Sequence, residues 1–257
     1  MSLAAQIGHI GWRAVRRTMR QPANVIFPFV FPTALLAVTS AGLSAATKLP
    51  GFPSDSFLAF FLAFPFIQGA LFATMNAGTD LARDIQTGFL NRLALTPMRG
   101  SALVAGQLGG IALMGLVQAI FYLAVGLAAG VRLESGIPGG FVLLALATLI
   151  AISFGALGAF FALRTGSSEA VQGLFPLLFV LLFLSSMNLP RNLIETDWFR
   201  TVATLNPVSY LIEGVRSLII TGWDTQALVL GFGIAAAMGV LSIVAASWAL
   251  RLRLTRT

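Results

Sequence analysis

Long apolar runs alternate with short polar segments along the whole chain. Six runs approach or exceed the roughly 20 helical residues that cross the hydrocarbon core of a bilayer. They are apolar on every face and show no period of two, so they predict helices and not strands. They cover residues 25–46, 57–79, 103–130, 138–163, 170–189 and 226–250. The pattern predicts an all-α polytopic membrane protein with a six-helix transmembrane domain over residues 25–257.

The composition supports this class and excludes several chemistries. Hydrophobic residues make up 57% of the 257 residues and charged residues only 10%, whereas soluble domains carry about 25% charged residues. The chain has no cysteine and one histidine, His9. A disulfide framework, a thiolate or histidine metal site and a Ser-His relay within the membrane are therefore excluded. We expect no catalytic residues, no metal and no cofactor on this chain.

The basic residues predict the orientation of the spans. If both termini lie on one side, that side carries Arg13, Arg16, Arg17, Arg20, Arg83, Arg92, Arg99, Arg164, Arg251, Arg253 and Arg256. The other side carries Lys48, Arg132, Arg191, Arg200 and Arg216. An excess of Lys and Arg marks the cytoplasmic side, so both termini are predicted to be cytoplasmic. The net charge of +7 is then a topology signal, and we expect no nucleic-acid partner.

The segment before the first span, residues 1–24, has the pattern of an interfacial amphipathic helix. Arg13, Arg16, Arg17 and Arg20 recur at i, i+3, i+4 and i+7 and share one face. Such a helix lies in the membrane interface with its arginines among anionic headgroups. Two interpretations stay open: the arginines only fix the topology, or the helix also contacts a cytoplasmic partner.

A polar island at residues 83–97 separates the second and third spans, within a predicted cytoplasmic segment at residues 80–99. Leu90, Leu93 and Ala94 give one apolar face, and Pro97 prevents simple continuation of the helix. Gly88 is expected to relieve steric crowding. The pattern predicts a short surface helix that a soluble partner could contact. Its candidate contact residues are Asp84, Gly88, Leu90, Arg92, Leu93, Thr96 and Pro97.

A second unusual segment, residues 190–222, lies between the fifth and sixth spans. Asn206 is a good N-cap with Pro207 at the first helical position. The helix that follows has about 14 residues before Gly222, too few to cross the membrane, so it predicts a re-entrant or interfacial helix on the outer side. Glu213 and Arg216 stand at i, i+3 and are expected to pair. They are either functional groups at membrane depth or charges that reach the surface.

Both segments resemble ABC-2-type exporter permeases, among them the daunorubicin-resistance type. In the first, an acidic residue is followed by glycine, a leucine-rich turn and Thr-Pro, here Asp84, Gly88, residues 90–95, Thr96 and Pro97. In the second, the matching pattern is Asn206, Pro207, Tyr210, Glu213 and Arg216. With the six spans, the resemblance covers essentially the whole chain. The chain departs from the family pattern in having Asp84 where glutamate is commoner, and in a short outer loop at residues 47–56.

The resemblance implies a non-catalytic permease subunit in the plasma (inner) membrane of a prokaryote. No Gly-rich loop ending in Gly-Lys-Ser/Thr is present, so ATP and magnesium are expected on a separate ATPase subunit, in two copies. A second permease copy, identical or related, would complete the pathway. The island at residues 83–97 is then the expected coupling contact.

The cargo is expected to be hydrophobic or amphipathic: a drug, a lipid or a lipid-linked molecule. Phenylalanines gather in the second and fifth spans at Phe57, Phe60, Phe61, Phe64, Phe66, Phe175, Phe179 and Phe183. They could line a path for such a cargo, but contact with lipid is the interpretation we favour. A secondary transporter driven by an ion gradient is the alternative function. A membrane-embedded enzyme is the least supported, because the spans contain no catalytic constellation.

Overall fold

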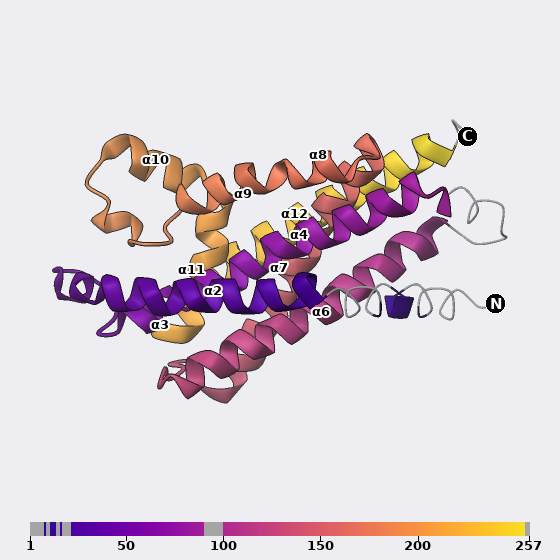
Figure 1. The fold of residues 1–257 in the computed structure, drawn as a ribbon. Coiled ribbons are helices and arrows are strands. Elements are labelled where there is room, and N and C mark those ends of the chain that lie inside the picture. The colour runs from indigo at the N-terminus through magenta and orange to yellow at the C-terminus, as the bar shows by residue number, and fades with distance from the viewer. Residues whose placement is uncertain (1–7, 9–10, 14–15, 17–21, 90–99, 255–257) are drawn as a thin grey trace.

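The computed structural model describes residues 8, 11–13, 16, 22–89 and 100–254, and every regular element it assigns there is helical. Figure 1 shows long helices running lengthwise through one bundle. The elements are α2 (Pro22–Gly42), η1 (Ser44–Lys48), α3 (Phe57–Phe61), α4 (Ala63–Gln86), α6 (Gly100–Ala128), α7 (Gly136–Thr165), α8 (Ser168–Gln172), α9 (Leu174–Phe183), η2 (Arg191–Leu193), α10 (Asp197–Leu205), α11 (Pro207–Ile220) and α12 (Thr225–Leu254).

Helix α4 is the centre of the bundle. It packs most extensively against α7 and also contacts α2, α6, α8 and α11. Of the most apolar stretch of α3 and α4, 89% of the residues are buried inside the protein, against 56% for α7, 28% for α6 and 22% for α12. The outer helices therefore turn most of their apolar side chains away from the protein, as helices facing lipid or another chain do.

Helices α4 and α7 approach each other through glycines. A β-carbon added at Gly158 would lie 2.1 Å from the carbonyl oxygen of Thr74, and one at Gly78 would lie 2.9 Å from the carbonyl oxygen of Gly158. The Thr74 hydroxyl crosses the same contact and donates a hydrogen bond to the Phe154 carbonyl at 2.9 Å. Small residues allow this backbone-to-backbone packing, which fixes α4 against its main neighbour.

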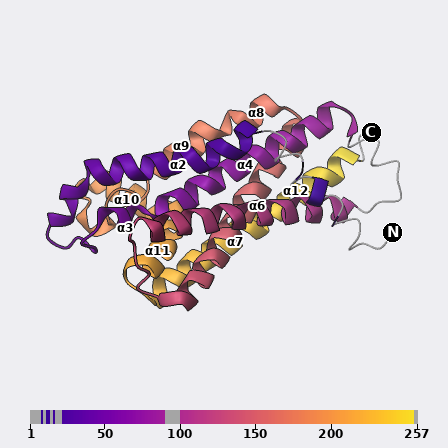
Figure 2. The same cartoon turned by 60° about the horizontal axis from the view of Figure 1, so that its bottom comes forward.

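The bundle has two ends of different character. At one, which we call the terminal end, lie Arg13, the end of α4, the α7–α8 turn and the last turn of α12. At the other, the loop end, lie η1, the α6–α7 connection, α10 and the α11–α12 turn (Figures 1 and 2). Within the described residues, the segments predicted to share one side of a membrane therefore lie at one end of the bundle.

The four tryptophans mark both ends. Trp12 and Trp248 belong to the terminal-end halves of their segments, and Trp198 and Trp223 belong to the loop end. All four are exposed, by 53% to 64%. Tryptophan gathers where the headgroups of a bilayer begin, so these positions have the distribution of two interfacial aromatic belts.

Four of the expected spans appear as helices long and apolar enough to cross a membrane. Within the described residues these are Phe57–Gln86, Val104–Ala128, Gly136–Thr165 and Thr225–Arg253. The first and fifth expected spans appear as shorter apolar helices, Ile26–Gly42 and Ser168–Phe183. The first span contains Pro28 and Pro32, and the fifth is divided at Gly173. The chain is thus an all-helical, multi-pass membrane protein.

One expectation about the core is wrong. Phe57, Phe60, Phe61, Phe64 and Phe66 are each at most 4% exposed, so they form the core around α3 and α4 and do not face lipid. The segment after the fifth apolar helix also contains a helix that the sequence did not predict, α10. This helix is amphipathic, with Ala203 buried and Trp198 exposed. Its apolar face is hard to recognise in the sequence because charged residues stand close by.

Candidate functional site

At the terminal end, an ion pair ties the N-terminal segment to α4. Arg13 donates hydrogen bonds to both carboxylate oxygens of Asp84, at 2.9 and 3.1 Å. Its guanidinium also lies 3.8 Å from the centre of the Phe89 ring. The Asp84 side chain is 10% exposed and that of Arg13 is 43% exposed. A two-point arginine–carboxylate contact fixes orientation as well as distance.

This contact corrects two expectations about the polar island. Arg83 and Asp84 were placed in a separate surface helix, but they form the last turns of α4, which continues to Gln86. Asp84 is buried against the N-terminal segment and is not an exposed contact residue. The apolar run of α4 and its polar end form one continuous helix because no residue between Ala63 and Gln86 breaks it after Pro65.

Gly88 is required by backbone conformation and not by crowding. Its φ is +67°, a value that favours glycine, while an added β-carbon would meet no atom within 4 Å. The amides of Thr87 and Gly88 donate to the carbonyls of Arg83 and Ile85 and close the end of α4. The remaining candidates of the island, Leu90, Arg92, Leu93, Thr96 and Pro97, lie outside the described residues.

The basic face of the N-terminal segment is described only in part. Arg13 turns toward Asp84, whereas Arg16 is exposed. Arg17 and Arg20 lie outside the described residues. Of the two open interpretations, a purely topological role does not account for Arg13, which holds two parts of the chain together.

At the loop end, α11 begins where its sequence predicts. The Asn206 side chain accepts a hydrogen bond from the Val208 amide at 2.9 Å, and Pro207 occupies the first helical position. The Asn206 amide also donates to the Leu181 carbonyl at 2.6 Å. One residue therefore caps α11 and attaches it to α9. The helix has 14 residues, in agreement with the expected short, non-spanning helix.

Arg216 is the most buried charged group of α11. It is 6% exposed and donates to three backbone carbonyls: Phe60 at 3.0 Å, Ser186 at 3.0 Å and Met187 at 2.9 Å. Its guanidinium also lies 3.6 Å from the centre of the Phe60 ring. Phe60 belongs to α3, just before the break at Leu62, and the other two carbonyls follow α9. Arg216 thus satisfies carbonyls where two helices are interrupted.

Glu213 does not pair with Arg216 as expected. Among the described residues its ion pair is with Arg191, at 2.5 Å, and it accepts a second hydrogen bond from the Ser186 hydroxyl at 2.9 Å. Arg191 also lies over the Tyr210 ring, 4.6 Å from its centre. Burial lowers the pKa of Arg191, but the Glu213 carboxylate and Tyr210 outweigh it, so the net direction is upward. The opposite charge of the carboxylate favours the ionised form of Arg191.

A cavity of about 370 Å³ lies beside this network. Its lining combines the charged side chains of Arg191, Glu213, Arg216 and Asp224 with the apolar side chains of Phe60 and Ile220. Such a lining can contact a molecule that has both charged and apolar parts. In the described part of the chain, no group of three or more His, Asp or Glu residues is placed to hold a metal ion.

The sequence profile of the ABC-2 type transporter family matches residues 5–220. The chain belongs to the ABC-2 type transporter family. The match includes the terminal-end pair, the broken helix α3–α4 and α11, so both polar contacts fall within the family domain.

Curated relatives of this ABC-2 type chain are named as drug-resistance permeases and as transport permeases. A daunorubicin resistance ABC transporter permease protein, DrrB1 of Streptomyces coeruleorubidus, is 27% identical over 85% of the chain and 76% of the relative. A probable doxorubicin resistance ABC transporter permease protein, DrrC of Mycobacterium tuberculosis, is 25% identical over 82% of the chain and 75% of the relative. A putative transport permease, ycf38 of Pyropia yezoensis, is 27% identical over 84% and 75%.

The outer charges of this ABC-2 type domain could be singled out from the sequence, but their partners could not. Arg191 was counted only as a loop charge, and Ser186 was not singled out. A usable signal was present: two consecutive serines, Ser185 and Ser186, interrupt an apolar run four residues before Pro190. Polar groups at the end of a buried run need partners, so these serines were candidates for a contact with the outer segment.

Proposed function

We propose that this chain is the transmembrane permease subunit of an ATP-driven exporter. It moves a hydrophobic or amphipathic compound outward across a prokaryotic plasma membrane, with its terminal end in the cytoplasm. Two copies of a separate ATPase subunit supply the energy, and a second permease copy, identical or related, completes the pathway. Family membership and the names of the drug-resistance relatives support the exporter role.

The observation that carries the mechanism is the position of α4. It runs from the break at Leu62, beside the Arg216 contact, to the Asp84 contact at the terminal end. An ATPase that displaces the segment after Gln86 moves the end of the most enclosed helix in the bundle. Since α4 packs closely against α7 at Gly78 and Gly158, the displacement moves both helices as a body and not by local repacking.

The Arg13–Asp84 pair makes the N-terminal segment part of this moving body. It joins two polar segments that are 71 residues apart in the chain and that the same ATPase could contact. A coupling contact has to differ in free energy between the two states of the transporter. A partly exposed ion pair can do so, because it can break without leaving both charges buried in apolar surroundings.

The test is transport coupling in the reconstituted complex. The permease is co-expressed with a cognate ATPase subunit, and ATP hydrolysis and ATP-dependent uptake of a fluorescent hydrophobic cation into inverted vesicles are measured together. Asp84→Asn and Arg13→Ala are expected to lower the ratio of transport to ATP hydrolysis by about fivefold or more, the lower end of ordinary coupling energies. The exchange variant carrying both Arg13→Asp and Asp84→Arg should recover part of it.

Arg16→Ala is the matched control, because Arg16 is an exposed arginine of the same segment. It should leave the ratio unchanged. Gly88→Val, which strains a backbone at φ +67° without creating a clash, should reduce binding of the ATPase subunit. Unchanged coupling in Asp84→Asn and Arg13→Ala, or uptake driven by an ion gradient in the absence of ATP, would show that the proposed function is wrong.

A further inference from the structure

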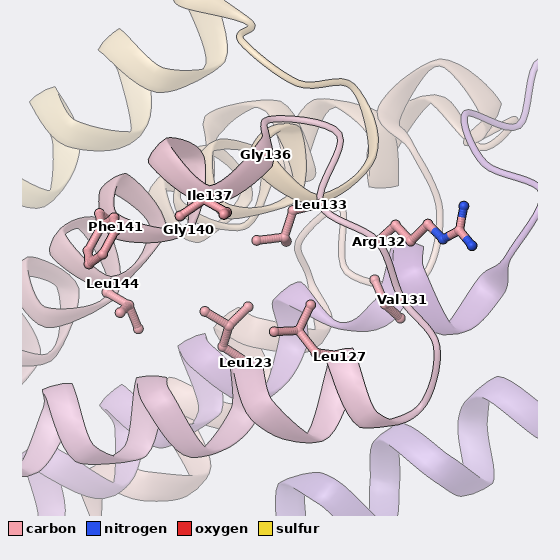
Figure 3. Close-up of a pocket in the computed structure, with 10 residues that line it drawn as sticks. All are labelled: Leu123, Leu127, Val131, Arg132, Leu133, Gly136, Ile137, Gly140, Phe141 and Leu144. Carbon is pink, nitrogen blue, oxygen red and sulfur yellow. The ribbon is translucent and has the colours of Figure 1, made fainter.

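A groove opens on the side of the bundle at the hairpin between α6 and α7. Figure 3 shows its lining: Leu123 and Leu127 rise from α6, Phe141 and Leu144 come from α7, and Leu133 lies between them on the connection. Its volume is about 440 Å³, within the range of about 300–1,000 Å³ that is usual for small-molecule sites. It is distinct from the cavity beside Arg216, which none of these residues lines.

The groove is apolar and open to the surroundings of the helices. Ile137 and Phe141 are exposed by 80% and 70%, although both lie on a helix that crosses the bundle lengthwise. Two glycines keep the space free: Gly136, with a φ of +65°, and Gly140, whose added β-carbon would approach Leu133 to 3.4 Å. A larger side chain at Gly140 would therefore enter the groove.

The groove has one charged end. Arg132 belongs to its lining, and in Figure 3 its guanidinium points away from the apolar side chains. The neighbouring acid is held on another face of the connection. The Glu134 amide donates to the Ile219 carbonyl and the Ser135 hydroxyl to the Leu218 carbonyl of α11. Glu134 does not line the groove. These hydrogen bonds also fix the connection in place along one side of the groove.

We propose that this groove binds an anionic phospholipid, with one acyl chain along Leu123, Leu127 and Phe141 and the headgroup phosphate paired with Arg132. The inference rests on where the charged and the apolar groups lie along the groove. The cation lies at the end of the bundle, where a headgroup is, and the apolar lining extends from it toward the middle of α6 and α7, where hydrocarbon is. A guanidinium can pair with the phosphate of either kind of headgroup, but only an anionic lipid carries a net negative charge that attracts it.

This inference requires the membrane placement of the helices but not the exporter function. It concerns a surface that the terminal-end pair and the Arg216 network do not use. Its failure would leave the proposed function unaffected, because the readout below contains neither ATP nor cargo. It also commits to a lipid and not to a second copy of the chain, because the groove combines a concave apolar wall with a charge at one end only.

The absence of cysteine allows a direct measurement. Ile137→Cys, labelled with bimane, places one fluorophore in the groove of the purified full-length chain. The protein is reconstituted in phosphatidylcholine vesicles that contain increasing fractions of a brominated lipid, either phosphatidylglycerol or phosphatidylcholine. Both test lipids carry dibrominated acyl chains, which quench the bimane fluorescence on contact. We expect quenching by phosphatidylglycerol to reach half-saturation at about a fivefold lower mole fraction, the effect of one basic residue near a membrane surface.

Arg132→Glu should abolish the preference, and Arg132→Lys should retain part of it. Lys48→Glu is the matched control, an exposed cation at the same end of the bundle that lies outside the groove, and it should leave the preference intact. Gly140→Leu should weaken quenching by both lipids. Equal quenching by the two lipids in the parent protein would overturn the proposal. So would an absence of quenching together with disulfide-linked dimers through unlabelled Ile137→Cys, which would make the groove an interface between copies.

Discussion

The two polar contacts at opposite ends of this bundle use the same side chain for different purposes. At the terminal end, Arg13 binds another side chain, Asp84, and keeps 43% of its own surface exposed. At the loop end, Arg216 binds three main-chain carbonyls and keeps 6% exposed. The first contact joins two segments that water or a partner can reach. The second replaces hydrogen bonds that interrupted helices lack.

Because of this difference, the terminal-end contact can break at a small cost in free energy, whereas loss of the loop-end contact is costly. Removing Arg13 opens the partly exposed space that its side chain fills, so water can reach the otherwise buried Asp84 carboxylate. Removing Arg216 leaves carbonyls of Phe60, Ser186 and Met187 in apolar surroundings, where each unsatisfied group costs free energy. We therefore expect the loop-end contact to determine stability and the terminal-end contact to determine coupling. Three measurements of unfolding test this division.

The largest effect is expected from Arg216→Leu. The variant loses three charge-assisted hydrogen bonds to buried carbonyls, and its free energy of unfolding should fall by about 3 kcal/mol or more. The measurement is SDS titration of the purified protein in mixed micelles. Arg200→Leu, at an exposed position of α10, is the control and should change stability by less than about 0.5 kcal/mol.

If Arg216→Leu does not accumulate, Arg216→Lys keeps the experiment informative. Lysine retains the charge but cannot reach three carbonyls with a planar fork, so an intermediate loss is expected. Wild-type stability in either variant would contradict the assignment of Arg216 as the group that closes the breaks after α3 and α9.

Glu213→Gln should have a smaller effect of the same kind. The amide can still accept from the Ser186 hydroxyl but loses the ion pair with Arg191, both partners of which are about a quarter exposed. A loss of about 1 kcal/mol is expected, the upper range for partly exposed pairs. Asp197→Asn, in the exposed pair with Arg200, is the matched control. Equal effects at the two sites would mean that burial does not distinguish them.

The smallest effect on stability is expected at the terminal end. A double-mutant cycle with Arg13→Ala and Asp84→Asn should give an interaction free energy of about 0.2–1 kcal/mol, measured by the same titration. The coupling loss in these variants should nevertheless be large, as described above. An interaction free energy comparable to the loss in Arg216→Leu would remove the contrast between the two ends.

Local signals in the sequence predicted the elements of this fold well. Four long helices follow from apolar runs, because length and hydropathy are properties of the segment itself. The start of α11 follows from Asn206 and Pro207, since a cap and a first-turn proline act on the next few residues. The sharing of one end by Arg13, the end of α4 and the end of α12 follows from the distribution of arginines.

The partners of polar groups could not be predicted from the same signals. Glu213 and Arg216 have helical spacing, yet Arg191 and three carbonyls bind them, because nearby chain breaks offer stronger contacts than a neighbour one turn away. Arg13 and Asp84 lie 71 residues apart, and only tertiary packing brings them together. The burial of Phe60 and Phe64 depends on which helix occupies the centre, and hydropathy alone does not rank helices in that way.

The glycine contact between α4 and α7 has a mechanical consequence. Because main chain meets main chain at Gly78 and Gly158, the spacing of the two helices does not depend on any side-chain rotamer. Side chains packed between two helices can change rotamer when one helix is displaced. Main-chain atoms held in helical hydrogen bonds cannot move without moving their helix. A small displacement of α4 along its axis is therefore expected to displace α7 as well.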